Sequence, residues 1–266
     1  MSLVLFGACN LKYKLLTGSG TLEMSEEIKI GILTGLTAEA RALGKQSDNF
    51  SVVTSAADAT RGTDRLRGLI NNGATLLGSV GVAGALKPGY KPGQIIVASS
   101  VMTHSTLNLT DEAHKNEANK HLKNVAYDAD KIWLSKIKDI FGEDADSGLL
   151  LGVDKPISKP SEKNNLHLLT GALAVDMESH IVAKLGAESD LPWFAIRVIS
   201  DPAERRIPEA ALAAIGSERE VSVARVIWAL LRRPVDFPAL MGVAGETSIA
   251  MRYLKRVGRD FRAATK

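Results

Sequence analysis

The fold is decided by residues 174–183, Ala174-Val175-Asp176-Met177-Glu178-Ser179-His180-Ile181-Val182-Ala183. The apolar run from Leu168 to Val175, broken by Thr170-Gly171, indicates a strand or its approach. Apolar residues at Ile181, Val182 and Leu185 then indicate a helix that ends at Gly186. Met177 and Glu178 therefore lie at a strand–helix junction, where open α/β sheets bind ligands and a carboxylate can accept hydrogen bonds from a polyol. On this stretch alone the simpler alternative is favoured, that Asp176 and Glu178 are first-turn acids that suit the helix dipole.

Two further carboxylates follow apolar runs. Residues 28–33 are typical of a buried parallel strand, and Glu39 lies just beyond them, on a helix with Thr37 as the expected N-cap. The β-branched run from Trp193 ends in Ser200-Asp201-Pro202, where the proline disfavours helical geometry at Asp201. A first-turn acid at Glu39 and an Asx-type turn at Asp201 are the local alternatives. Three acids on alternating strand–helix units make a shared site as reasonable as these separate local roles.

Alternating strands and helices predict a three-layer α/β/α domain with a central mixed, mostly parallel sheet. Further strands are expected over residues 74–80, 94–100 and 147–153, and further helices over 62–72, 127–141, 208–215, 219–231 and 239–259. An exposed active-site loop is expected over residues 154–165. The glycines at 81 and 84 would let the backbone approach a ligand closely.

Composition bounds the organisation and excludes several classes of protein. A chain of 266 residues, 45% hydrophobic and 24% charged, suits one globular domain with small appendages. We expect a poorly ordered extension over residues 1–23, a main domain over 24–230 and a basic helical C-terminal extension over 231–266. Cys9 is the only cysteine, which excludes an intrachain disulfide and a CxxC pair. The histidines lack HExxH spacing, so we expect no metal, and no apolar run is long enough to span a membrane.

Four blocks of the sequence resemble the purine nucleoside phosphorylase and methylthioadenosine/S-adenosylhomocysteine nucleosidase superfamily. They are Lys29-Ile30-Gly31-Ile32 through Glu39, Gly81-Val82-Ala83-Gly84-Ala85-Leu86, Ala174-Val175-Asp176-Met177-Glu178 and Arg197-Val198-Ile199-Ser200-Asp201. The blocks occur in the family's order and cover about residues 28–230, and the Met-Glu and Ser-Asp blocks together are the most specific. The resemblance implies a nucleoside phosphorylase-like fold and cleavage of the N-glycosidic bond of a purine nucleoside.

The resemblance also implies a role for each matched side chain. Glu178 would accept hydrogen bonds from the ribose 2′- and 3′-hydroxyls, and Met177 would pack on the sugar. Asp201 would protonate or hydrogen-bond N7 of the leaving purine, and Glu39 would activate water, as in the nucleosidase branch. The other matched positions of the substrate site are Ser200, Gly81, Val82 and Ala83. A protonating acid contributes roughly 10²–10⁴-fold to such a reaction, and a closely paired arginine (Arg197, Arg205 or Arg206) would oppose that role of Asp201.

Several positions depart from the family pattern. Ser79 stands where hexameric phosphorylases have an arginine, which favours hydrolysis and leaves inorganic phosphate open as a co-substrate, with no other cofactor expected. Val82 stands where nucleosidases often have a hydroxyl residue, and no aromatic residue that would stack on the purine occurs near residues 154–158. A phosphorolytic enzyme and a nucleoside-binding protein without activity therefore remain the alternatives.

A narrower resemblance concerns the tail, which carries ten Lys/Arg against four Asp/Glu from Arg219 onward. Residues 225–234, Arg225-Val226-Ile227-Trp228-Ala229-Leu230-Leu231-Arg232-Arg233-Pro234, are similar to the hopanoid-associated phosphorylase branch. That branch is implicated in removing adenine from adenosylhopane, which implies a 5′-modified adenosine with a polycyclic lipid as the substrate. The tail would dock on an anionic membrane through Trp228, Phe237, Leu240, Met241 and Tyr253 among Arg232, Arg233, Arg252, Lys255 and Arg256. The alternative is an ordinary packed helix pair with solvated arginines.

The expected partners follow from the same resemblance. The family commonly forms dimers or hexamers, so a homo-oligomer is expected, located in the cytoplasm or peripherally at the inner face of the membrane. Nucleic acid is not an expected partner, because the arginines are not interleaved with aromatic platforms that stack bases.

Overall fold

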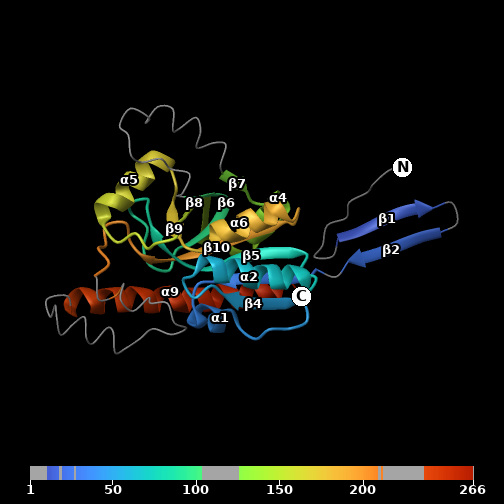
Figure 1. Cartoon of the computed structure of the whole chain (residues 1–266), viewed down its shortest axis with the longest axis horizontal. Coiled ribbons are helices and arrows are strands. Elements are labelled where there is room, and N and C mark those ends of the chain that lie inside the picture. The colour runs from blue at the N-terminus through green and yellow to red at the C-terminus, as the bar shows by residue number, and fades with distance from the viewer. Residues whose placement is uncertain are drawn as a thin grey trace.

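The computed structural model describes residues 11–17, 20–26, 28–103, 126–208, 211 and 237–265. Its main body is a single mixed sheet with helices on both faces (Figure 1). The strands of this sheet are β3 (Ile30–Thr34), β4 (Phe50–Thr54), β5 (Leu76–Ala85), β6 (Ile95–Thr103), β7 (Ala126–Asp128), β8 (Ala145–Gly152), β9 (Ala174–Asp176) and β10 (Trp193–Asp201).

The strand order is β10-β6-β8-β9-β5-β3-β4, with β7 paired to β6. Because β10 also pairs with β5, five strands close into a ring from which β3 and β4 extend. The pairings of β5 with β3 and β10, of β8 with β6 and β9, and of β3 with β4 are parallel. The pairings β10–β6, β5–β9 and β6–β7 are antiparallel. The predicted mixed, mostly parallel sheet is therefore confirmed.

Two helical layers enclose the sheet. One face is covered by α1 (Thr37–Leu43), α4 (Lys131–Phe141) and α9 (Phe237–Ala264), and the other by α2 (Ala59–Asn71) and α6 (Ser179–Glu188). Each face has its own apolar cluster, because the inner residues of β5 and β10 alternate between the two. The α/β/α class predicted from the sequence is confirmed. The remaining helix, α5 (Pro160–Thr170), packs at one end of the body against β8 and β9.

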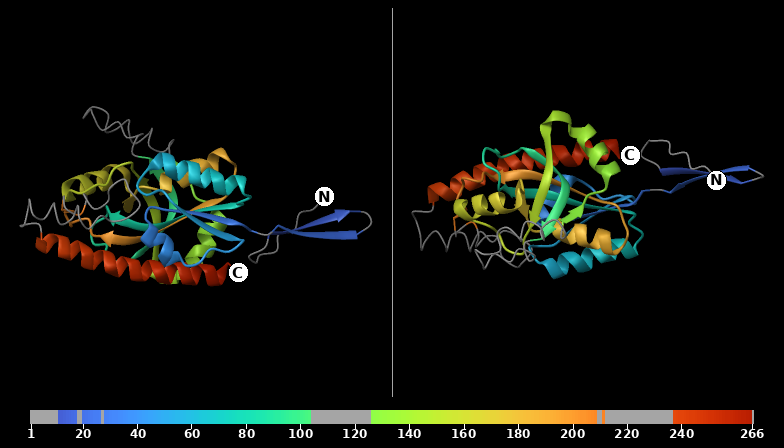
Figure 2. Two further views of the ribbon diagram at one scale, coloured as in Figure 1. Left: turned by 60° about the horizontal axis from the view of Figure 1, so that its bottom comes forward. Right: turned by 90° about the horizontal axis from the view of Figure 1, so that it is seen from above.

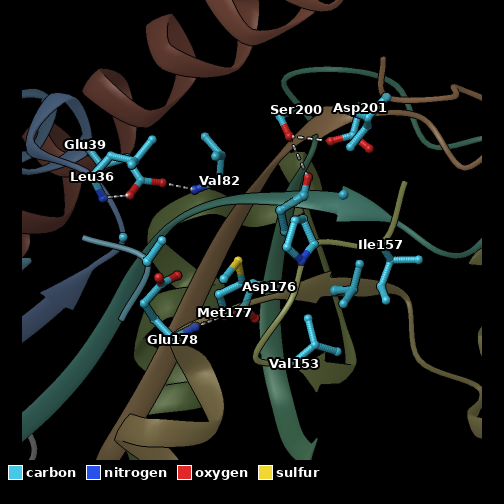
Figure 3. A pocket seen from close by; sticks show the side chains of 17 residues that line it. Leu36, Glu39, Val82, Val153, Ile157, Asp176, Met177, Glu178, Ser200 and Asp201 are labelled. Atoms are coloured by element: carbon cyan, nitrogen blue, oxygen red, sulfur yellow. Dashed lines mark hydrogen bonds between the residues drawn. The ribbon is translucent and has the colours of Figure 1, made fainter. Parts of the chain in front are cut away.

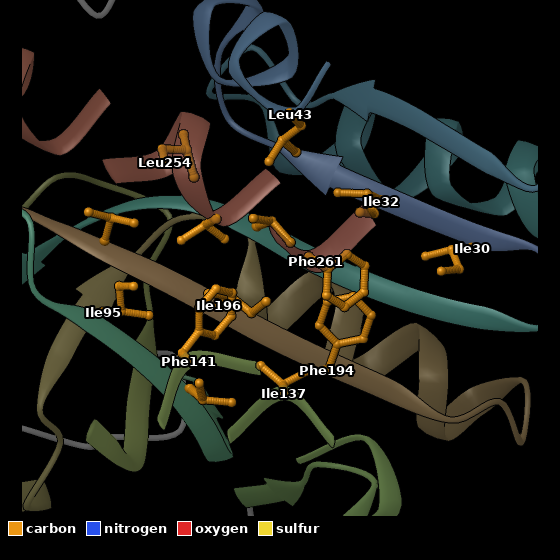
Figure 4. Close-up of a cluster of buried hydrophobic side chains, with 14 of the residues drawn as sticks. Ile30, Ile32, Leu43, Ile95, Ile137, Phe141, Phe194, Ile196, Leu254 and Phe261 are labelled. Carbon is orange, nitrogen blue, oxygen red and sulfur yellow. The ribbon is translucent and has the colours of Figure 1, made fainter. Parts of the chain in front are cut away.

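The C-terminal helix α9 runs along the length of one sheet face (Figure 2). Its inner face contributes Ala250, Leu254, Val257 and Phe261 to the core cluster drawn in Figure 4. The Phe261 ring lies 5.0 Å, between centroids, from the ring of Phe194 in β10. The tail is therefore helical over residues 237–264, as predicted, and this helix also forms part of one helical layer of the fold.

The outer face of α9 holds the exposed residues predicted to meet a membrane. Met241, Tyr253, Arg252, Lys255 and Arg256 are exposed there. Trp228, Arg232 and Arg233, and the side chains of Phe237 and Leu240, lie outside the described part of the chain. So do the helix predicted for 219–231 and most of the one predicted for 208–215. No helix in the described ranges is both long and apolar enough to cross a bilayer. Membrane contact stays a prediction.

The N-terminal segment forms a two-stranded antiparallel hairpin of β1 (Leu11–Thr17) and β2 (Gly20–Glu26), with Leu11 opposite Glu26. The hairpin projects away from the main body in Figure 1. The predicted extension was residues 1–23, so the proposed boundary at Met24 falls inside β2.

The prediction of a strand or its approach from Leu168 to Val175 was wrong for the first part of that run. Leu168 to Thr170 belong to α5, the helix ends at Gly171 in a left-handed conformation (φ 72°), and the strand covers only Ala174–Asp176. The predicted exposed loop over 154–165 accordingly gives way to this helix at Pro160, in the first turn, where proline is well tolerated. Strand β4 was not expected, and β5 continues through the glycine block instead of ending at residue 80.

Candidate active site

A cavity of about 150 Å³ opens where β3, β5, β9 and β10 end. Figure 3 shows its polar side chains converging from these separate elements. The register of β10 against β5 shifts between Ile199, opposite Ala83, and Asp201, opposite Gly84, so Ser200 is an inserted bulge residue. A bulge re-aims the side chains beside it, and here both Ser200 and Asp201 line the cavity.

Glu39 is buried at 3% exposure and held by the backbone. Its Oε2 accepts a hydrogen bond from the N–H of Leu36 at 2.7 Å, and its Oε1 accepts one from the N–H of Val82 at 2.7 Å. The N-cap of α1 is Leu36, and not Thr37 as was predicted. Glu39 is an acid in the first turn of this helix, which was the local alternative, and it also lines the cavity. Burial raises the pKa of Glu39, although these two backbone donors and Arg197 oppose the rise.

Glu178 follows β9 and precedes α6. Its Oε1 accepts a hydrogen bond from the hydroxyl of Ser55 at 2.8 Å. Burial, and then the charge of Glu39, raises the pKa of Glu178 to about 8. A carboxyl group that is largely protonated at neutral pH can both donate to and accept from a pair of hydroxyls.

Asp201 lies at the other end of the cavity, beside Ser200. Its Oδ1 lies 2.7 Å from the Ser200 hydroxyl, which is also 3.1 Å from the carbonyl oxygen of Ala83. A serine hydroxyl has one proton, so Ser200 can donate to only one of these two acceptors at a time. It donates to Asp201 when that side chain is a carboxylate, and it can donate to Ala83 when Asp201 carries a proton. Lys163 of α5, a residue that was not considered from the sequence, donates to Oδ2 of Asp201.

Arg197 and Asp176 form a buried ion pair beneath the carboxylates. Nη2 of Arg197 donates to Oδ1 of Asp176 at 2.7 Å and to the hydroxyl of Ser79. Burial alone would raise the pKa of Asp176, but Arg197 and the donors of Ser179 outweigh it and hold that pKa below the ordinary value. Nε and Nη1 of Arg197 are buried and have no hydrogen-bond partner among the described residues.

Three glycines each make room for one carboxylate. A Cβ at Gly81 would lie 2.7 Å from Glu39 Oε1, one at Gly35 would lie 2.9 Å from Glu178 Oε1, and one at Gly84 would lie 3.0 Å from Asp201 Oδ2. Real Cβ atoms essentially never make contacts as short as those at Gly81 and Gly35, and the contact at Gly84 is tighter than nine in ten real ones. Gly81 and Gly84 belong to the glycine block found in the sequence, which was expected to let the backbone approach a ligand. In the structure these glycines make room for the carboxylates of Glu39 and Asp201.

The remaining wall is apolar. It is formed by Leu36, Ala57, Val82, Ala83, Val153, Pro156, Ile157, Val175, Met177 and Ile207. None of the described lining residues is aromatic, so aliphatic side chains would have to contact a flat ligand. In the same described ranges, no group of three or more His, Cys, Asp or Glu residues could hold a metal ion.

The structure brings seven of the eight predicted site residues to this cavity. Glu39, Met177, Glu178, Val82, Ala83, Ser200 and Asp201 line it, and Gly81 lies behind Glu39. Sequence reasoning missed Ser55 and Lys163, and it considered Arg197 only as a cation that would oppose Asp201, whereas Arg197 pairs with Asp176. Lys163 shares a buried face with Leu166, three residues on, but that signal depends on recognising α5 as a helix.

The chain belongs to the phosphorylase superfamily, because the model of that family matches residues 32–232. Among curated proteins it is similar to the 5′-methylthioadenosine/S-adenosylhomocysteine nucleosidases of Mycobacterium bovis and Mycobacterium tuberculosis. The identity with each is 30% over 144 residues, which is 46% of this chain and 56% of the relative. The match thus spans about half the length of these curated relatives.

Solved structures share the fold. The 5′-methylthioadenosine/S-adenosylhomocysteine nucleosidase of Helicobacter pylori matches with a TM-score of 0.57 and 20% identity, over 80% of this chain and 100% of that one. The futalosine hydrolase of the same organism matches with a TM-score of 0.56 and 18% identity, over 77% of this chain and 98% of that one. At these identities the likeness shows the architecture alone.

Proposed function

We propose that the protein hydrolyses the N-glycosidic bond of a purine nucleoside and releases the base. The observation that carries this proposal is the placement of Glu39, Glu178 and Asp201 around one cavity with an apolar wall. The curated relatives named as nucleosidases support it.

The three acids fit the charges that develop when this bond breaks. As the bond between C1′ and N9 lengthens, its electron pair moves to the base and positive charge grows on the sugar. Asp201 gives a proton to N7 of the base, which neutralises the leaving group. Glu178 holds the ribose hydroxyls, with Met177 against the sugar. Glu39 accepts a proton from the water whose oxygen bonds to C1′.

Water is favoured over phosphate as the nucleophile. The N–H groups of Leu36 and Val82 would be natural donors to a phosphate oxygen, but both are already bound to Glu39. A dianion placed beside Glu39 would also be repelled. Arg197 has no exposed surface and does not line the cavity, and none of the described lining residues is a cation that could receive a phosphate.

For the substrate we propose a 5′-modified adenosine, with adenosylhopane as the leading candidate from the resemblance of the tail. A cavity of about 150 Å³ has no room for a polycyclic lipid, so the 5′ substituent would leave it. The exposed basic and apolar residues of α9 would then contact an anionic membrane. This contact could be made by a homo-oligomer or by a single chain.

One assay tests the activity. Purified protein is incubated with methylthioadenosine, inosine and an adenosyl-lipid, with and without phosphate, and free base is followed. Ribose as the sugar product supports hydrolysis, ribose 1-phosphate indicates phosphorolysis, and tight binding without release of base indicates an inactive binding protein.

The matched variant is Asp201→Asn, not Asp201→Ala. Removing the side chain would leave the ammonium of Lys163 buried without its partner, a loss that commonly costs about 3–5 kcal/mol. Asparagine keeps an acceptor for Lys163 but cannot give a proton to N7. We expect purine release to fall by about 10²–10⁴-fold. Full turnover by Asp201→Asn would remove this residue from the mechanism.

A further inference from the structure

Lys163 is a charged side chain with no exposed surface, and its whole hydrogen-bonding capacity is used. Its ammonium donates to Oδ2 of Asp201, to the carbonyl oxygen of Pro202 at 3.0 Å and to that of Arg205 at 3.2 Å. An ammonium has three protons, so each of them has one acceptor. A buried lysine without a partner is costly, and this complete set of acceptors explains how the fold tolerates it.

The two oxygens of Asp201 face different donors. Oδ2 is bound by Lys163, and Oδ1 by the hydroxyl of Ser200 at 2.7 Å. Lys163 does not line the cavity, whereas both Ser200 and Asp201 do. Lys163 can therefore reach the cavity only through the carboxyl group of Asp201.

We propose that Lys163 is a positioning residue that makes Asp201 an effective acid toward the leaving base, an inference that rests on the proposed function. In each turnover Asp201 takes up a proton from solvent and gives it to the base, and its carboxylate stays in contact with the ammonium of Lys163. By holding Oδ2 from a position outside the cavity lining, Lys163 leaves Oδ1, beside Ser200 of that lining, as the oxygen that faces the base and delivers the proton. Lys163 itself transfers no proton.

The same ammonium ties together the turn after β10. Its bonds to the carbonyls of Pro202 and Arg205 fix residues 202–205, which lead to Ile207 in the cavity wall. A purely structural role would consist of this second set of bonds alone. Losing it would disturb the binding of every substrate, whatever its leaving group.

The test compares leaving groups that do and do not need a proton. Lys163→Met removes the charge and keeps the apolar stem, and Lys159→Met is the matched control, an exposed lysine immediately before the same helix. With the purine nucleoside that the protein cleaves best, kcat of Lys163→Met should fall about 10–10²-fold, below the roughly 10²–10⁴-fold of a whole general acid. KM should change less than about threefold. With p-nitrophenyl riboside, whose phenolate leaves unprotonated, both variants should match the unaltered protein within about twofold.

The other outcomes are decisive. Equal losses on both substrates, or a KM change that accounts for the loss, would assign Lys163 to the fold alone and overturn the proposal, as would unchanged purine cleavage. If Lys163→Met does not fold, Lys163→Gln, which retains two N–H donors without charge, should show the same split. If the unaltered protein does not cleave the phenyl riboside, purine nucleosides of graded base basicity replace it, and a loss that does not grow with basicity overturns the proposal. Cleavage of the phenyl riboside but of no purine nucleoside would instead refute the proposed function.

Discussion

The Glu39 carboxylate and the Val82 backbone N–H are joined by a hydrogen bond of 2.7 Å, although 43 residues separate them in the chain. The bond links the first turn of α1 to the middle of β5. The second oxygen of Glu39 is held by Leu36 at the start of its own helix. A side chain fixed at both oxygens cannot change rotamer without losing a buried hydrogen bond, so Glu39 presents its free lone pairs to the cavity in one orientation.

Glu39→Gln tests the role of this carboxylate as a base. The amide keeps the size of the side chain but cannot accept the proton of an attacking water. Its nitrogen also cannot accept one of the two backbone N–H bonds, so the free energy of unfolding should fall by about 1–3 kcal/mol. We expect kcat for the release of base to fall by about 10²–10⁴-fold, with the affinity for a non-hydrolysable nucleoside analogue little changed. Binding is measured by calorimetry, and Glu162→Gln, an exposed position on α5, serves as the control. Retained turnover would show that another group activates the nucleophile.

Gly81→Ala should lower both stability and turnover, because the added Cβ would collide with Glu39. The new Cβ would lie 2.7 Å from Oε1 of Glu39 and 3.1 Å from Nη1 of Arg197, and neither side chain is free to move away. Overpacking of this kind costs about 1–3 kcal/mol, and displaced Glu39 should lower turnover as well. The control is Gly68→Ala in α2, where no atom lies within 4 Å and alanine should stabilise the helix by about 0.5–1 kcal/mol. Denaturant unfolding of the two variants measures the difference, and equal stability would contradict the close packing.

The sequence predicted the layers and most of the cavity because both follow from local patterns. Apolar runs at β3 and β10 marked buried strands, and an acid after each run marked an edge where strand ends meet. Glu39, Glu178 and Asp201 could be found in this way without knowing the order of the strands.

The rest depended on contacts that no local pattern encodes. Lys163 is a polar residue in a polar helix, and only the packing of α5 against the turn after β10 buries it. Arg197 lies in an otherwise apolar strand, and its partner Asp176 comes from a strand that is not its neighbour in the sheet. The short strand β9 was overestimated because the apolar residues at the end of α5, where Leu168 is exposed, run on into those of the strand without a clear period.

Leu254→Ala tests whether α9 is part of the core. Leu254 has no exposed surface and packs in the cluster of β5, β10 and α1, so its truncation should cost about 2–5 kcal/mol. The adjacent Lys255 is exposed, and Lys255→Ala should change the free energy of unfolding by less than about 0.5 kcal/mol. Urea unfolding measures both. A small effect of Leu254→Ala would indicate an appended helix that the main domain can do without.

The raised pKa of Glu178 predicts a pH-dependent loss of stability that Glu178→Gln should remove. Burial and the charge of Glu39 raise this pKa from 4.5 to about 8, so the folded protein holds a proton that the unfolded chain has released. The stability that this proton contributes is fully present below about pH 4.5 and is lost as the pH rises through about 8, by at most on the order of 5 kcal/mol. Glutamine at this position is neutral at every pH, so it makes no pH-dependent contribution to the free energy of unfolding. The melting temperature of the unaltered protein, relative to that of Glu178→Gln, should therefore fall between pH 5 and pH 9. A constant difference across that range would mean that Glu178 is ionised in the folded protein at neutral pH.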